Sequence, residues 1–142
     1  TLSVDSFEAC RNGAYSWDDV AFAVTALRER GIRTAIDLSL GMPDEPDENA
    51  VETIRFFREN PADSVNVNAW YRVYAGTALE ALLRKREDLH RFLSAPMPEG
   101  PPLEKLFFNC LPMARIKELI GNDPMFKLEG YDPGVNYELL RD

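Results

Sequence analysis

Asp37 is the one acidic residue in the short apolar run Thr34–Pro43, TAIDLSLGMP. So short and apolar a run predicts a fully buried parallel strand. Gly41 and Pro43 then turn the chain sharply away from the strand end. An acid beside such a turn, at the carboxyl end of a buried strand, is typical of ligand sites in α/β proteins. The structural alternative is that Asp37 caps a neighbouring helix or pairs with an arginine, because buried acids need partners.

A second group of polar side chains alternates with apolar ones over Ser64–Tyr71. This period of two predicts a strand whose even-numbered residues share one face. That face carries Asn66, Asn68, Trp70 and Arg72. Contact with a helix layer would bury two asparagines, which is unfavourable. The face is therefore a candidate binding surface.

Other residues with reactive side chains form no recognisable site. Cys10 and Cys110 make no metal-binding pattern and are too few for a disulfide scaffold, so a reducing, cytoplasmic setting is expected. His90 lies late in a basic helix and is assigned to the surface. The remaining charges that we considered are assigned to solvated loops or helix ends: Glu8, Glu45, Glu48, Lys85 and Arg86.

Composition narrows the class of protein. The 142 residues are 45% hydrophobic, which suffices for one domain with a sizeable core. The net charge of −8 argues against nucleic acid as a main partner. The longest apolar runs fall well short of a membrane span, and no signal peptide is visible. The chain begins at Thr1, within a predicted strand, which suggests a piece of a longer protein.

The expected elements alternate between strands and helices. Ser16 predicts a helix start and Gly31 its end. Strand–helix repetition implies a parallel sheet with right-handed crossovers. Before the proline-rich stretch 94–102, we expect strands at Leu2–Ser6, Thr34–Pro43 and Ser64–Tyr71, and helices after Ser16, at Ala50–Glu59 and from Ala78 to about Phe92. Beyond it we expect a strand over Leu103–Phe108, a helix over Met113–Ile120, and no element in the turn-rich tail Asn122–Asp142.

Three stretches together resemble the radical S-adenosylmethionine (radical SAM) enzyme family. Leu2–Phe7 (LSVDSF), Gly31–Pro43 (GIRTAIDLSLGMP) and Val65–Leu79 (VNVNAWYRVYAGTAL) are similar to the fourth, fifth and sixth strands of its partial barrel. The likeness ends near Lys85 and is closest to the coproporphyrinogen dehydrogenase and cobalamin-binding branches. The family's CxxxCxxC loop is absent, and two distant cysteines cannot replace its three closely spaced thiolates.

The resemblance implies an α/β fold with three consecutive parallel strand–helix units. Residues 1–93 would form the carboxyl-terminal half of a partial TIM-type barrel, and residues 94–142 an irregular, α-containing extension. A half barrel leaves a sheet edge open, and such edges invite association. We therefore expect this fragment to dimerise, or its tail, Leu103–Asp142, to cover the edge.

The resemblance also implies roles for individual residues. Asp5 and Asp37 would hold the ribose hydroxyls of S-adenosylmethionine, since a carboxylate accepts from both hydroxyls of a diol. Gly41 would let the backbone pass close to the adenine. Asp5 could instead serve a cap or turn, and Gly41 a tight turn alone. Asn66 and Asn68 would line the substrate chamber, with Arg72 at its rim. No catalytic or metal-binding residue is assigned.

The implied protein is an iron–sulfur oxidoreductase that cleaves S-adenosylmethionine at a 4Fe–4S cluster and abstracts hydrogen from a small-molecule substrate. Methylation, ring formation or oxidation in tetrapyrrole or natural-product metabolism would fit, with or without cobalamin. This chain alone would be inactive. The alternative is a stand-alone acidic α/β interaction module that binds a partner through the face of Asn66 and Arg72. Convergence of Asp5, Asp37 and Asn66 at one end of a parallel sheet would favour the first hypothesis.

Overall fold

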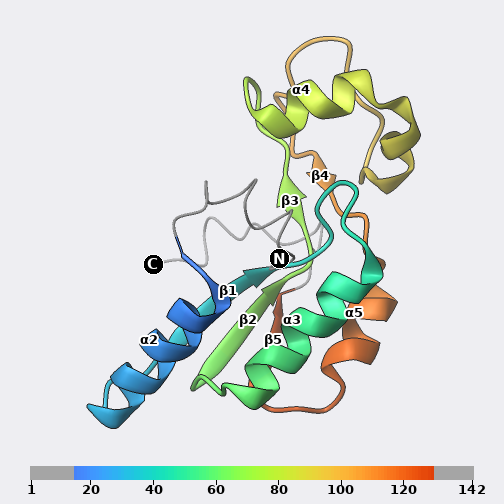
Figure 1. The fold of residues 1–142 in the computed structure, drawn as a ribbon. Coiled ribbons are helices and arrows are strands. Elements are labelled where there is room, and N and C mark those ends of the chain that lie inside the picture. The colour runs from blue at the N-terminus through green and yellow to red at the C-terminus, as the bar shows by residue number, and fades with distance from the viewer. Residues whose placement is uncertain (1–14, 130–142) are drawn as a thin grey trace.

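The computed structural model describes residues 15–129. The predicted strand Leu2–Ser6, with Asp5, and Cys10 lie outside the described residues. The described part is a mixed α/β fold: a three-stranded parallel sheet with helices, and a smaller two-stranded sheet (Figure 1). The three parallel strands form no closed barrel.

The parallel sheet consists of β1 (Ala35–Ser39), β2 (Ser64–Asn68) and β5 (Phe126–Glu129), in the order β1-β2-β5. Both pairings are parallel, which confirms the predicted sheet type. The third strand comes from the tail, where no element was predicted. It pairs with β2 and so covers the edge of the sheet at β2, which was one of the two outcomes expected for residues 103–142. Dimerisation stays a prediction.

The prediction of a fully buried strand at β1 is wrong. Ala35 and Asp37 are exposed, and Leu38 is the one buried residue of the strand. The reason is topological. Among the described strands β1 lies at the edge of the sheet, and the core cluster with α3 and α5 lies against the face opposite Asp37.

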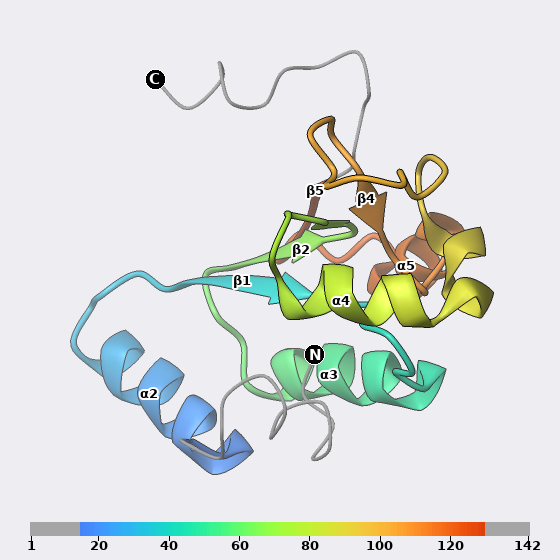
Figure 2. The ribbon, with the colours of Figure 1, turned by 90° about the horizontal axis from the view of Figure 1, so that it is seen from above.

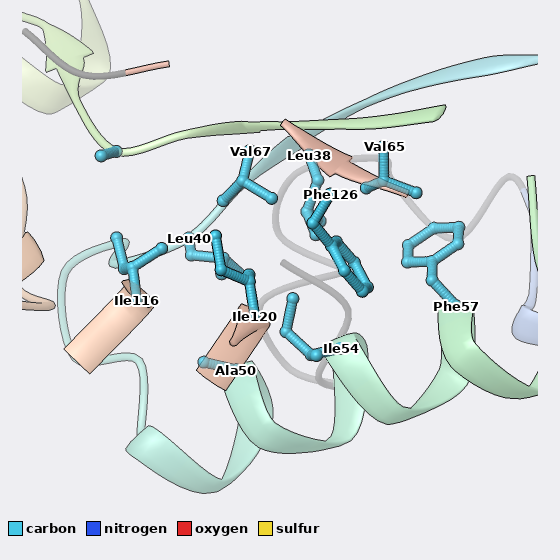
Figure 3. Close-up of a cluster of buried hydrophobic side chains, with 11 residues drawn as sticks. Leu38, Leu40, Ala50, Ile54, Phe57, Val65, Val67, Ile116, Ile120 and Phe126 are labelled. Carbon is cyan, nitrogen blue, oxygen red and sulfur yellow. The ribbon is translucent and has the colours of Figure 1, made fainter. Parts of the chain in front are cut away.

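Two helices cover the other face of the sheet, α3 (Asp47–Glu59) and α5 (Met113–Ile120) (Figure 3). α3 begins three residues earlier than predicted, with Pro46 at its N-cap, and its residue Val51 is 38% exposed. Arg58 donates to the carbonyl oxygens of Leu119 and Ile120, at 2.8 and 3.1 Å, and so ties α3 to the end of α5. The buried cluster contains Leu38, Leu40, Ala50, Ile54, Phe57, Val65, Val67, Ala69, Ile116, Ile120 and Phe126.

Helix α2 (Trp17–Glu29) precedes β1 and lies on the same side of it as α3 (Figure 2). Its start is the predicted one. The Ser16 hydroxyl accepts from the Asp19 backbone N–H, and the Asp19 carboxylate accepts from the Ser16 N–H at 2.6 Å. This reciprocal capping satisfies backbone donors that the helix leaves unpaired. Gly31, at φ +68°, carries the chain out of the helix.

Residues 69–112, called the insertion below, leave the parallel sheet after β2 and return to it at α5. Its strands β3 (Tyr71–Arg72) and β4 (Phe107–Phe108) pair antiparallel. Helix α4 (Ala78–Lys85) and the 3₁₀ helix η1 (Glu87–Phe92) pack with them (Figure 1). They share a second buried cluster of Val73, Leu83, Leu89, Leu106 and Phe108.

The insertion corrects three predictions. The strand predicted over Ser64–Tyr71 is divided, because β2 pairs with β5 as far as Asn68 while Tyr71 pairs with Phe108. The helix predicted from Ala78 to Phe92 is interrupted at Arg86. The three strand–helix units are not consecutive, because α4 belongs to the second cluster and α5 connects β2 to β5.

Candidate functional site

The face of the parallel sheet opposite α3 and α5 carries polar residues. Val65 and Val67 point into the core with the helices, so the alternate residues of β2 point the other way (Figure 3). The register places Asp37, Asn66 and Lys127 side by side across the three strands. Ser39 and Asn68 follow in the next row, which ends at Glu129. We call positions 37, 39, 66, 68 and 127 the polar face.

Asp37 and Asn66 meet on the polar face. The Asn66 Nδ2 amide donates to Asp37 Oδ1 at 3.0 Å, and Asp37 is exposed while Asn66 is half-buried. The contact follows from the parallel register, in which the two residues are direct partners. Asp37 stands in the middle of β1 rather than at its end, and its hydrogen bond within the described residues goes to Asn66. Asp5, the third residue of the predicted convergence, lies outside the described residues.

The polar face offers carboxylate and carboxamide groups over an extended area. Adjacent strands lie about 4.8 Å apart, and successive residues on one face about 6.6 Å apart along a strand. Asp37 supplies acceptors, whereas Asn66 and Asn68 each supply both donors and acceptors. Such groups suit a ligand with several hydroxyls, which donate and accept in turn.

Arg72 does not share this face. It lies on β3, which pairs with β4 and not with the parallel sheet. Its guanidinium carbon lies 4.7 Å from the ring centroid of Tyr74, a cation–π distance. The prediction that Asn66, Asn68 and Arg72 share one surface is therefore wrong for Arg72. Only the two asparagines lie on the parallel sheet.

Gly41 lies in the turn that follows β1 and faces the side chain of Asn109. Its φ is +88°, and a Cβ at this position would lie 2.0 Å from Asn109 Oδ1. Asn109 is 7% exposed, and its Nδ2 donates to the carbonyl oxygens of Leu40 (2.8 Å) and Ala69. Its Oδ1 accepts from the Leu111 N–H. Asn109 therefore joins the chain after β1 to the chain after β2. The adenine contact of Gly41 stays a prediction.

Glu45 closes the same turn and is not the solvated loop charge that we expected. Its Oε2 accepts from the backbone N–H groups of Gly41 and Met42, at 2.8 and 2.9 Å. The same spacing recurs in the insertion, where Gly76 donates to Glu80 Oε2 at 2.6 Å. This repeated spacing, a glycine followed by a glutamate four residues later, is a sequence signal that could have indicated the role of Glu45. No local signal indicates Asn109, whose partners are distant backbone carbonyls.

A groove of about 480 Å³ lies elsewhere, between α2 and the start of β1. Its lining is mainly apolar and includes Val20, Ala23, Leu27 and Ile36. It lies beside the amino end of β1, where Thr34 and Ala35 line it. Neither Asp37 nor either asparagine of the polar face lines it, so we regard the polar face as the candidate site.

Residues 15–129 contain no cluster of three or more histidines, cysteines or carboxylates placed to bind a metal ion. Cys110 is half-buried, and burial raises the pKa of its thiol. These residues therefore do not fit an iron–sulfur cluster. Within residues 15–129, no helix has the length and hydrophobicity needed to cross a membrane.

Comparison of the chain with protein-family models, with curated proteins and with solved structures found no match.

Proposed function

We propose that the polar face binds the ribose of S-adenosylmethionine, and that this chain is the carboxyl-terminal part of the partial barrel of a radical SAM iron–sulfur oxidoreductase. The observation that carries the proposal is the contact between Asp37 and Asn66. A carboxylate and a carboxamide, hydrogen-bonded at 3.0 Å, stand at paired positions of parallel strands on the face opposite α3 and α5.

Asp37 is suited to a diol because only one hydrogen bond from a described residue reaches it, at Oδ1. The donated amide orients the carboxylate, and its other oxygen can accept from ribose hydroxyls. Hydrogen bonds to an ionised acceptor are roughly twice as strong as neutral ones. Asn66 retains its carbonyl oxygen, and Asn68 adds a second carboxamide nearer the carboxyl end of β2.

The arrangement of strands and helices supports the barrel. β1, β2 and β5 follow the order of the chain, and α3 and α5 lie on one face of them. In barrels of this type the helices form the outer layer, and active sites lie at the carboxyl ends of the strands, in the loops that follow them. The insertion follows β2 at that end. Together these features support a segment of a partial TIM-type barrel.

The bound S-adenosylmethionine and a 4Fe–4S cluster would supply reductive cleavage and a 5′-deoxyadenosyl radical, and this chemistry belongs to the cofactors. The sequence has no CxxxCxxC pattern, so the cluster ligands would come from residues outside this sequence, and the chain alone would be inactive. Here Asp37 holds the ribose and the two asparagines border the substrate. The substrate contact of Arg72 stays a prediction, because Arg72 lies on β3, away from the polar face. A cytoplasmic location belongs to the same proposal.

The test is a titration of the ¹⁵N-labelled chain, followed by NMR, with adenosine and with 2′,3′-dideoxyadenosine. The second nucleoside lacks the diol and is otherwise matched. We expect saturable shifts at the backbone amides of residues 37–39 and 64–68 with adenosine and S-adenosylmethionine, and much weaker ones with the dideoxynucleoside. Asp37→Ala should abolish the shifts. Glu52→Ala, an exposed charge change on α3, should keep them.

Two results would contradict the proposal. Equal responses to the two nucleosides would show that the diol is not recognised. Absence of any response at millimolar concentration, together with self-association of the chain, would favour the interaction module instead.

A further inference from the structure

Lys127 is a cationic residue on the polar face. It is the register partner of Asn66, which is itself the partner of Asp37. One row across three strands therefore carries a carboxylate, a carboxamide and an ammonium group. The backbones at the two ends of this row lie two strand spacings apart, about 10 Å, and the long, flexible side chain of Lys127 can span part of that distance.

The backbone of Lys127 is held in place while its side chain is exposed. Phe126 on one side is 6% exposed and belongs to the core, and Leu128 on the other side packs against that core. β5 is further fixed by its parallel pairing with β2. Lys127 itself is exposed and forms no ion pair with another described residue. A flexible ammonium on a fixed strand suits a charged ligand group.

We propose that Lys127 binds an anionic group, a carboxylate or a phosphate, of a ligand whose hydroxyls contact Asp37. This inference rests on the proposed function, because it assumes that the ribose lies at Asp37 and Asn66. It adds a residue to the proposed site, one that holds the anionic end of the nucleoside ligand. The charge pattern of the row supports this polarity, since Asp37 repels an anion at one end and Lys127 attracts it at the other.

The experiment compares three ligands on the whole chain: adenosine, adenosine 5′-monophosphate and adenosine 5′-carboxylate. Dissociation constants come from the NMR titration. An exposed ion pair strengthens binding by up to about fivefold. We expect one or both anionic ligands to bind about fivefold more tightly than adenosine, and high salt to remove the gain. The better of the two identifies the anion as carboxylate or phosphate.

Variants separate Lys127 from a general charge effect. Lys127→Gln should remove the gain of the anionic ligands over adenosine. Lys117→Gln, an equal charge change at an exposed position on α5, should keep the gain. Loss of the gain in both variants, or in neither, overturns the assignment of Lys127.

The two proposals fail in different ways. If adenosine binds and the anionic ligands bind no more tightly, the Lys127 assignment is wrong and the ribose site stands. If no nucleoside binds, both are wrong. If the anionic ligands bind equally well to Asp37→Ala, the anion is held without the ribose contact and the joint site is overturned.

Discussion

Substitution of Gly41 by alanine should destabilise the fold mainly through Asn109. A Cβ at position 41 would lie 2.0 Å from Asn109 Oδ1, far closer than any real contact, so the asparagine side chain must move. Movement breaks its bonds to the carbonyls of Leu40 and Ala69 and to the Leu111 N–H. Each buried group left unpaired costs about 1–3 kcal/mol. We expect these losses to total about 2–4 kcal/mol after partial relaxation.

The backbone conformation adds a smaller cost. Gly41 has φ +88°, where an alanine is disfavoured by about 1–2 kcal/mol. Gly41→Ala should therefore lose about 3–6 kcal/mol of unfolding free energy. Asn109→Ala should lose about 2–4 kcal/mol, since it removes the same hydrogen bonds. Once Asn109 is alanine there is no side chain to displace, so adding Gly41→Ala costs only the backbone portion, about 1–2 kcal/mol.

The assay is a double-mutant cycle from urea unfolding, followed by circular dichroism. A stabilising osmolyte such as TMAO keeps all four proteins folded at the start of the titration. The two substitutions should be strongly non-additive, with a coupling of about 2–4 kcal/mol. Equal costs of Gly41→Ala in both backgrounds would refute the argument and show that the turn does not depend on Asn109.

Three further predictions concern other contacts. Hydrogen bonds from the Gly76 N–H and from Arg84 hold the pKa of Glu80 below its ordinary value of 4.5. The ionised Glu80 side chain therefore contributes its full stabilisation above pH 4.5, and this stabilisation is lost as the pH falls through the lower pKa of the folded state. The melting temperature of Glu80→Gln should fall below that of the parent at pH 7, and the gap should close at low pH; a gap independent of pH would contradict this. Asp44 has φ +59° and forms an exposed ion pair with Arg86. The unfolding free energy of Asp44→Gly in urea should therefore stay within about 1 kcal/mol of the parent value. Asp44→Val should be about 1–2 kcal/mol less stable than the glycine variant, and equal stabilities of the two variants would refute the role of φ. Arg58→Met should lose about 1 kcal/mol in the same assay because α5 loses the donor at its last carbonyls, while Arg55→Met, an exposed control with one 4.0 Å pair, should change stability by less than about 0.5 kcal/mol.

Local sequence signals correctly predicted the helices whose ends are marked by typical capping residues. Ser16 and Gly31 mark the ends of α2, and α5 has the predicted bounds, Met113–Ile120, with Gly121 at its C-cap. β5 escaped prediction because four residues between turns carry too little local signal. Its sequence FKLE does alternate, but only the pairing with β2 distinguishes it from a loop. The placement of α4 was wrong because an apolar helix face fits a second cluster as well as it fits a sheet.

The candidate site was predictable only where the local strand pattern determines the position of its residues. Strand parity and parallel pairing put Asp37 and Asn66 on one face of the sheet, and the register then makes them direct partners. Asn109 could not be found this way, because the backbone carbonyls that it bonds are far away in the sequence. Leu40 is 69 positions away from Asn109, and Ala69 is 40 positions away. Arg72 was misplaced because the period of two continues in the sequence after the strand has left the sheet.

The insertion has a consequence for the order of folding. β2 and β5 pair although their partner residues are about 60 positions apart, and closing so long a loop costs conformational entropy before the pairing returns any energy. Most of that loop is the insertion, which has its own buried cluster and whose two ends Asn109 holds together. Once the insertion is folded, it acts as a short, stiff link between β2 and α5. The pairing of β2 with β5 then has the effective contact order of an ordinary strand–helix–strand unit.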